Sequence, residues 1–300
     1  MKTNFVTLFI GIIFLSIQAV QAESKVLLRL NLQKGTKYEM TMDMDNAVNQ
    51  TMMGKDMKIS QKMVMVFTYH ILEVLPNKNF LMEYSISHMK MNMVVNEKEM
   101  NFDSQHPDTL NPMSGLFKGL FYDTLKLELS PRGQVERVEG LEEYVKKISQ
   151  NPMMAQAMQM FSSDKSFKSF VGQTFNYFPE SEVAQGDKWT STFTLPAMMN
   201  MEAVMNFEVA AIEKDQTVLN VLSDINVDGP FEQNGMKFNI KMTGTQHGSM
   251  TIDSNDGWFR LSDLTQKMDL TMKMKNPQTG EDLEIPMLMN SVAIMTVVKK

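Results

Sequence analysis

Apolar and polar residues alternate along much of this chain with a period of two. Between Tyr38 and Met44 the even positions are apolar, and the odd positions are Glu, Thr and Asp. The same alternation recurs in residues 57–71, 80–86, 236–242 and 268–274. Turn-forming sequences lie between such segments, at 76–79, 130–133, 234–235 and 254–257. One polar and one apolar face is typical of antiparallel strands, so the pattern predicts a mainly β fold with a large curved antiparallel sheet.

The apolar positions change parity within residues 80–95. They are even from Phe80 to Ile86 and odd from Met89 to Val95. Because the side-chain period of a strand is two, one regular strand cannot hold both sets on the same face. A β-bulge near Ser87 would restore the register. The alternative is that the second half of the strand packs against a different layer.

The middle of the chain has a helical pattern instead. Apolar residues follow a spacing of three and four at Leu141, Tyr144, Val145 and Ile148, and again at Met154, Met158 and Phe161. Asn151-Pro152 has the sequence of a helix start. We expect Asp164 to cap a last short helix that Gly172 ends. The order is therefore strands, then a short helical segment, then strands.

The first residues have the features of a secretory signal peptide. Lys2 precedes an apolar stretch at 5–17, and a small-residue cleavage site ends at Ala22. A membrane-anchoring helix is the alternative, but about 20 consecutive apolar residues are needed to span a bilayer. We therefore expect an exported protein, periplasmic or extracellular, without a transmembrane segment in its mature chain.

The mature chain is expected to consist of three parts. After the signal peptide at 1–22, these are a first antiparallel β half, a helical segment and a second antiparallel β half, at 23–139, 140–172 and 173–300. The sequences Gly35-Thr-Lys-Tyr38 and Gly186-Asp-Lys-Trp189 are similar. They leave open whether the sheet consists of two related halves or merely repeats a common hairpin sequence.

Composition narrows the classes of function. The chain has no cysteine, which excludes disulfides, thiolate catalysis, cysteine zinc sites and an N-terminal lipid anchor on cysteine. A net charge of −6 argues against a nucleic-acid partner, which would require a basic surface. The chain is unusually rich in methionine, with 32 in 300 residues.

Catalytic and metal-binding motifs are mostly missing from the sequence. The histidines lack metal-binding spacing, and no nucleophile elbow or phosphate loop occurs. Residues 162–165 match Ser-x-x-Lys but more simply start a helix. Residues 253–257 resemble a calcium loop, yet its twelfth position is Leu264, so a hairpin turn is preferred. Asp43 and Asp45 fit a solvated face better than a cation site. We expect no enzyme and no cofactor, although carboxylates paired across strands stay open.

Two segments resemble a known family. Gly-Gln-Val-Glu-Arg-Val-Glu-Gly at 133–140 and Val-Ala-Gln-Gly-Asp-Lys-Trp at 183–189 are similar to recurring pieces of an uncharacterised family of exported Gram-negative bacterial proteins, a domain of unknown function. The resemblance covers nearly all of the mature chain. It implies a secreted β-rich fold and brings no catalytic residues. The expected architecture is also similar, as a fold alone, to periplasmic lipoprotein carriers of the LolA type.

The methionines favour a binding hypothesis. Methionine is flexible and polarizable, which suits surfaces that accept varied apolar shapes. If the apolar strand faces are concave and covered by the helices, they form a pocket for a lipid or a lipoprotein acyl chain. The predicted ligand-binding residues are Met40, Met42, Met44, Met63, Met65, Phe67, Met154, Met158, Phe161, Met268, Met272 and Met274.

Two other interpretations of the methionines remain open. Thioethers bind Cu(I), and His88, Met89, Met91 and Met93 are the best candidate site for copper handling. Methionine also fills protein cores, in which case the chain is an envelope structural or interaction protein with a protein partner and no small ligand. The preferred prediction is a non-catalytic exported protein that binds an apolar ligand.

Overall fold

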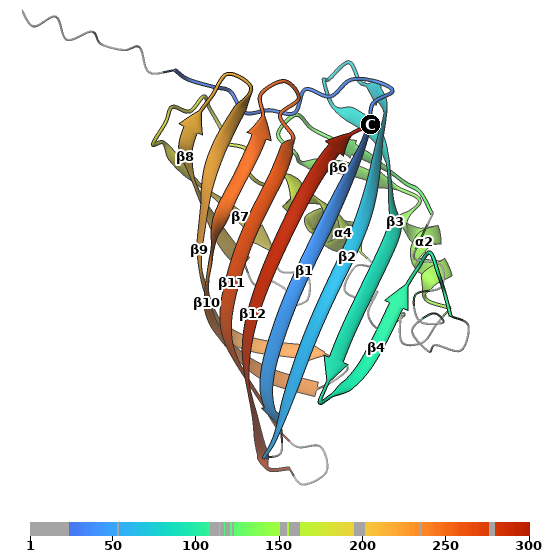
Figure 1. Cartoon of the computed structure of the whole chain (residues 1–300), viewed down its shortest axis with the longest axis vertical. Helices are drawn as coiled ribbons and strands as arrows, with labels where there is room; N and C mark the ends of the chain where they lie inside the picture. The colour runs from blue at the N-terminus through green and yellow to red at the C-terminus, as the bar shows by residue number, and fades with distance from the viewer. Residues whose placement is uncertain are drawn as a thin grey trace, which may run out of the picture.

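A computed structural model of the chain describes residues 24–300 except 53, 109–113, 115–116, 118–120, 122, 151–154, 156–162, 195–201, 234–235 and 276–279. The described part is mainly β, as predicted, and its strands form one 12-stranded antiparallel sheet (Figure 1). The strands are β1 (Lys37–Met52), β2 (Lys55–Val74), β3 (Phe80–Val95), β4 (Lys98–Asp103), β5 (Leu125–Leu129), β6 (Val135–Glu139), β7 (Lys188–Thr194), β8 (Glu202–Ile212), β9 (Gln216–Gln233), β10 (Met236–Asp253), β11 (Phe259–Lys275) and β12 (Asp282–Lys299).

The first and last strands meet in the middle of the sheet. The strand order is β6-β5-β3-β2-β1-β12-β11-β10-β9-β8-β7, and β4 pairs with β3 beside this path. β1 pairs with β12 from Tyr38–Lys299 to Gln50–Met287. The sheet is strongly curved, and the long central strands in Figure 1 present its outer face to the viewer. Strands β1 to β6 precede residue 140 and β7 to β12 follow residue 172, while the exact domain boundaries and the idea of related halves stay predictions.

The predicted β-bulge in the third strand is confirmed. Val66 of β2 is opposite His88, but the next residue, Phe67, is opposite Ile86. Ser87 is therefore the extra residue. This insertion lets Tyr84 and Met89 both point to the inner face, where both are buried, so β3 keeps one apolar face along its whole length.

The predicted turns at 76–79, 130–133 and 254–257 connect β2 to β3, β5 to β6 and β10 to β11; residues 234–235 lie outside the described residues. Gly257 has a left-handed φ of 73°. A Cβ atom there would lie 1.8 Å from the carbonyl oxygen of Arg29. Only glycine therefore fits this turn, which packs directly on the N-terminal segment.

Two described helices lie between the strand sets: α2 (Leu141–Ile148) and α4 (Asp164–Gly172), which continues into the 3-10 turn η2 (Gln173–Phe175). The predicted cap of α4 is wrong by one residue, because Ser163 accepts a hydrogen bond from the backbone N–H of Ser166. The predicted end of α4 at Gly172 is confirmed, and the chain continues directly into η2 because the φ of Gly172, −61°, is right-handed. No described helix has the length and apolarity required to cross a membrane.

A cluster of aromatic residues fills one end of the inner face. The Trp258 ring lies 4.5 Å from the Tyr38 ring, 5.0 Å from Tyr69 and 5.1 Å from Phe175. All four side chains are at most 1% exposed. The cluster brings together β1, β2, η2 and the turn before β11, so it fixes the end of α4 against the sheet.

Candidate functional site

A cavity of about 510 Å³ lies between the inner face of the sheet and the segment formed by α4 and η2. Its walls come from eight strands and are mostly apolar, with a few amide and hydroxyl groups. The lining residues are Met40, Met42, Phe67, Tyr69, Tyr84, Phe170, Val171, Gln173, Thr174, Met205, Ser223, Ile225, Met242, Gln246, Met250, Leu264, Gln266, Met268 and Met295. None of these residues carries a charge.

Two glycines shape the wall formed by β10. Gly244 and Gly248 lie on the inner face on either side of Gln246, so the strand has no side chain at either position. A Cβ atom at Gly248 would lie 1.8 Å from the carbonyl oxygen of Asp263, and one at Gly244 would lie 2.4 Å from that of Lys267. The close approach of β11 to β10 therefore requires glycine at both positions.

Tyrosine and phenylalanine form the wall next to the aromatic cluster. Tyr69 and Tyr84 are neighbours across β2 and β3, with ring centroids 5.3 Å apart, and Phe67 stacks on Tyr84. Burial raises the pKa of the Tyr69 and Tyr84 hydroxyls well above their ordinary value. Both phenols therefore stay protonated near neutral pH and face the cavity as uncharged groups.

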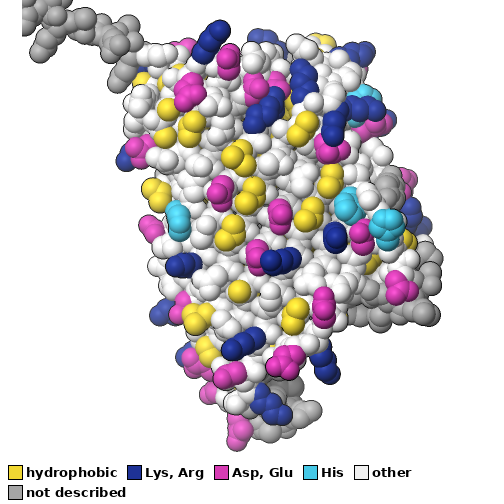
Figure 2. Space-filling model, in the orientation of Figure 1, with side chains coloured by type: hydrophobic (Ala, Val, Ile, Leu, Met, Phe, Trp, Pro, Cys, Tyr) yellow, Lys and Arg dark blue, Asp and Glu magenta, His cyan; other side chains and the backbone are white. Residues whose placement is uncertain are grey.

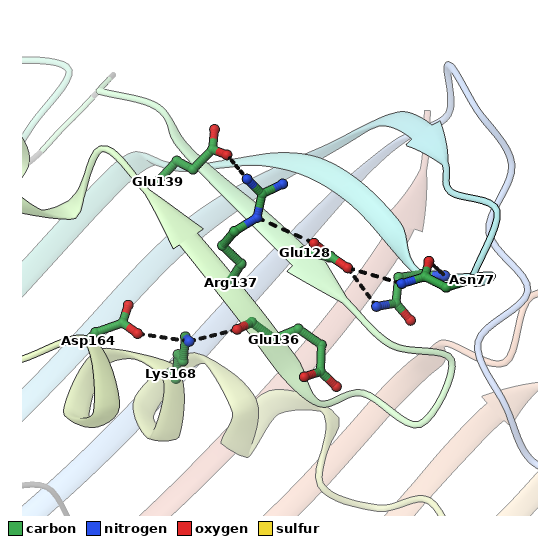
Figure 3. Close-up of polar contacts among 8 residues, drawn as sticks. Asn77, Glu128, Glu136, Arg137, Glu139, Asp164 and Lys168 are labelled. Carbon is green, nitrogen blue, oxygen red and sulfur yellow. Dashed lines mark hydrogen bonds and ion pairs between the residues drawn. The ribbon is translucent and has the colours of Figure 1, made fainter.

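The helix α4 covers the cavity and is tied to the edge strand β6 (Figure 3). Lys168 donates a hydrogen bond of 2.6 Å to the backbone carbonyl of Glu136, and its ammonium lies 2.8 Å from the Asp164 carboxylate. These contacts place Val171 over the cavity, while Phe170 is 40% exposed at its margin. The polar contacts of α4 thus lie at its edge, while Phe167 and Val171 pack in the core.

A carboxylate on β5 holds the strands to which α4 is attached (Figure 3). Glu128 accepts a 2.7 Å hydrogen bond from the Asn79 amide and a longer one of 3.4 Å from Asn77. Its other oxygen lies 3.4 Å from Arg137 Nε, and Arg137 also contacts Glu139. The hydrogen bond from Asn79, together with that from Asn77 and the charge of Arg137, lowers the pKa of Glu128.

Four of the predicted ligand-binding residues line the cavity: Met40, Met42, Phe67 and Met268. Others lie further along the same inner face. Met44, Met63 and Met65 are half-buried neighbours on β1 and β2, Met272 packs against a separate cluster around Ile240, and Met274 is paired with Phe238. Met154, Met158 and Phe161 lie outside the described residues. The predicted set as a binding site stays a prediction.

Sequence reasoning missed Met295 and the polar lining residues Ser223, Gln246 and Gln266. Met295 belongs to β12, where the residues between the inner positions include Leu288, Val292 and Ile294, all exposed on the outer face. Both faces of β12 are therefore partly apolar, and no alternation marks its inner side. The polar residues interrupt an apolar face, so a search for apolar periodicity passes over them.

The candidate copper residues point in two directions. The His88 ring lies 3.0 Å from the Asp103 carboxylate, whereas Met89 and Met91 are buried with Phe102 on the other face of the strand. The Met91 sulfur accepts a hydrogen bond from the Gln61 amide. Among the described residues, no three His, Asp or Glu side chains form a group that could hold a metal ion.

The other candidate carboxylates also have protein partners. Asp253 and Asp256 lie 3.1 and 2.5 Å from Arg260, and both accept backbone hydrogen bonds within their turn. Asp45 lies 3.5 Å from Lys62 across the outer face. Ser163 serves as a helix cap. Each of these contacts has an ordinary structural purpose.

A second hollow, of about 840 Å³, lies over strands β7 to β10. Its lining includes the exposed residues Lys188, Asp224 and His247 and the half-buried Glu208. Ser223 and Gln246 belong to this lining and to that of the smaller cavity. Lys188 and Glu208 pair with each other. The larger hollow thus has a solvated, mixed-charge wall, and the smaller one is the better candidate for an apolar ligand.

Comparison with solved structures finds only distant likenesses. A structure of lipid–protein interactions in lipovitellin has a TM-score of 0.45 at 8% identity; it covers 89% of this chain, but the chain spans only 25% of that protein. An outer membrane channel from Pseudomonas putida has a TM-score of 0.20 at 7% identity over 90% of this chain and 97% of the other. OccK7 from Pseudomonas aeruginosa has a TM-score of 0.22 at 6% identity, over 88% of this chain and 100% of the other.

Comparison by sequence gives one clear result. No curated protein matches the chain. The pattern of one family, described as a family of unknown function, matches residues 77–259, which run from the turn before β3 to the start of β11 and include both α2 and α4. This match covers more than half of the chain and confirms the expected resemblance to a family of unknown function, over a shorter stretch than the nearly complete mature chain that was expected. The chain therefore belongs to DUF6263, a family of unknown function.

Proposed function

We propose that this protein is an exported, non-catalytic binding protein that holds an apolar ligand, such as a lipid acyl chain, in the cavity between the sheet and α4. The observation that carries the proposal is the lining of that cavity. Its volume of about 510 Å³ lies within the range of about 300–1,000 Å³ that is usual for small-molecule sites. Its walls are mostly apolar and contain no charged residue.

The type of apolar residue in the cavity lining also supports an acyl chain as the ligand. Seven methionines line the cavity: Met40, Met42, Met205, Met242, Met250, Met268 and Met295. Unbranched thioether side chains adjust to ligands of different shape at little cost. The cavity is continuous with an inner face on which further half-buried methionines, such as Met44 and Met63, extend along the strands. A chain longer than the cavity therefore has an apolar surface along which to continue.

The proposal is tested by ligand capture. Protein exported into a bacterial periplasm should carry lipid in native mass spectrometry, and delipidated protein should bind an apolar fluorescent dye such as N-phenyl-1-naphthylamine. If no lipid co-purifies and the dye does not bind, the proposal is wrong, and an envelope structural or interaction protein becomes the better hypothesis.

A matched pair of variants locates the binding. Met268 lines the cavity, and its neighbour Lys267 is exposed on the outer face of the same strand. Met268→Trp should fill part of the cavity and abolish most dye binding, whereas Lys267→Trp should leave it unchanged. Thermal melting of both variants establishes that the fold survives, since overpacking costs about 1–3 kcal/mol. Equal dye binding by the two variants would place the dye elsewhere.

A further inference from the structure

We infer that the bound ligand carries an uncharged hydrogen-bonding group beside its apolar chain, namely an ester or amide, and that a row of neutral polar side chains on the inner face recognises it. This inference rests on the proposed function and names the class of ligand. It follows from the register of six strands, from the partners of the row and from the distribution of charge.

The row crosses six neighbouring strands without a gap. Each member is directly opposite the next in the sheet register: Gln61 on β2, Asn46 on β1, Ser291 on β12, Gln266 on β11, Gln246 on β10 and Ser223 on β9. Directly opposite residues of antiparallel strands share a face and have Cβ atoms about 4.5–5.5 Å apart. The six side chains therefore form a continuous polar line across the inner face.

The rows on either side of this line contain no polar side chain. The neighbouring row on the side of the aromatic cluster lies two residues away along each strand. It consists of Met63, Met44, Ala293, Leu264, Gly248 and Val221. The neighbouring row on the other side, again two residues away along each strand, consists of Ile59, Val48, Met289, Met268, Gly244 and Ile225. The polar line is thus bordered on both sides by rows of apolar residues.

In one half of the row, the polar side chains have hydrogen-bond partners within the protein. The Ser291 hydroxyl lies 2.5 Å from the Asn46 carbonyl, the Asn46 amide donates to Gln61 at 3.4 Å, and Gln61 donates to the Met91 sulfur at 3.2 Å. This half lies outside the cavity lining. Its hydrogen bonds account for its position on the inner face without a ligand.

The other half of the row lines the cavity. Ser223 donates to the backbone carbonyl of Val204, but no hydrogen bond joins the side-chain amides of Gln246 and Gln266 to another described residue. Both side chains are half-buried, and Gly244 and Gly248 leave the space beside Gln246 free of side chains. A half-buried amide on an apolar wall gains from a hydrogen-bonding partner, and each amide both donates and accepts.

The charge distribution selects among polar ligand groups. None of the cavity-lining residues is charged, and the charged side chains of these strands, such as Lys267 and Lys241, are exposed on the opposite face. Figure 2 shows acidic and basic side chains spread over that outer face. A carboxylate in the cavity would be buried without a cation, which is strongly unfavourable. An ester or amide carbonyl accepts from glutamine N–H groups at no such cost.

The test compares ligands with the same chain and different head groups. Delipidated protein is titrated with methyl laurate and with laurate at pH 8, and displacement of N-phenyl-1-naphthylamine is measured. Methyl laurate should bind at least about tenfold more tightly than laurate. Equal or tighter binding of laurate would overturn the inference while leaving the proposed function intact. Failure of the dye and of both ligands to bind would instead reject the proposed function.

A variant pair separates recognition by the row from simple exclusion of charge. Gln246→Met with Gln266→Met keeps the side-chain lengths and should weaken methyl laurate binding about tenfold, the loss of one or two net hydrogen bonds. Thr243→Leu on the outer face of β10 is the control and should leave the affinities for methyl laurate and for the dye unchanged. If the double variant folds and binds methyl laurate like the wild type, the row serves the sheet register only. If it does not fold, Gln266→Met alone is measured against the same prediction.

Discussion

At the scale of single residues, one carboxylate joins two distant parts of the chain. Asp256 accepts a 3.0 Å hydrogen bond from the Tyr38 hydroxyl and another from the backbone N–H of Trp258, and it pairs with Arg260 at 2.5 Å. Its side chain is only 6% exposed. Burial, together with the nearby Asp256 charge, raises the pKa of Tyr38, so the phenol remains a donor. A buried charge with this many partners makes the turn before β11 specific to one arrangement.

Replacing this carboxylate should therefore be costly. Asp256→Asn leaves Arg260 without its nearest partner and is expected to lower the free energy of unfolding by about 3 kcal/mol. Tyr38→Phe removes only one hydrogen bond and should cost about 1 kcal/mol. Urea denaturation followed by tryptophan fluorescence measures both. A loss for Asp256→Asn no larger than that for Tyr38→Phe would contradict the proposed importance of the ion pair.

At the scale of elements, the helix α4 depends on few polar contacts. Its first residue, Asp164, and the backbone of β6 both hold Lys168, while Phe167 and Val171 face the core. The strand β6 is held in turn through Glu128 of β5 and Asn79 of the preceding turn. The position of α4 over the cavity therefore depends on polar contacts at its edge as well as on apolar packing.

Loosening one of these contacts should mobilise α4. Lys168→Met removes the hydrogen bond to Glu136 and the pairing with Asp164, and we expect faster amide hydrogen exchange across residues 164–172. Lys165→Met is the matched control, because Lys165 is exposed on the same helix. Unchanged exchange in the Lys168 variant would mean that apolar packing alone holds the helix.

The lowered pKa of Glu128 predicts a pH dependence. A carboxylate with a depressed pKa in the folded state stabilises the fold above its ordinary pKa of about 4.5 and loses that contribution as pH falls through the lowered value. The stability difference between wild type and Glu128→Gln should therefore be largest at neutral pH and shrink below about pH 4.5. Denaturation at a series of pH values measures this difference. A difference that is independent of pH would contradict the assignment.

Elements could be predicted from the sequence where one of their faces is apolar and the other is polar. The parity change at Ser87 revealed a bulge, because β3 is apolar on one side and polar on the other. The start of α4 was misplaced by one residue because Ser163 and Asp164 are both good caps, and only the Ser166 contact distinguishes them. Met295 was missed since β12 is apolar on both faces. The meeting of Gln246 and Gln266 in the cavity could not be foreseen, since opposition across strands depends on register.

At the scale of the whole molecule, the methionines of the inner face fall into two groups that differ in their position relative to the cavity. Those of the cavity, such as Met42, Met268 and Met295, surround an internal space. Others, such as Met274 and Met287, lie half-buried on the same face away from it. Because a thioether is oxidised readily when oxidant reaches it, the two groups should respond differently to an occupant of the cavity.

Oxidation can therefore map the ligand. Brief peroxide treatment followed by peptide mass spectrometry should oxidise Met42, Met268 and Met295 several-fold more slowly when methyl laurate is bound. Oxidation of Met274 and Met287 is the internal control and should be unaffected. Protection of the control methionines alone would place the ligand outside the proposed cavity.

The pairing of the first strand with the last has a consequence for how the chain acquires its structure. Tyr38 cannot pair with Lys299 until residue 299 has been synthesised, so this central contact joins residues that are 299 − 38 = 261 positions apart. Such a topology folds slowly, because loop-closure entropy must be lost before the contact forms. Until then, β1 and β11 each have an exposed edge that can recruit other chains. A chaperone that shields the growing polypeptide would therefore matter more for this protein than for a sheet built from sequential hairpins alone.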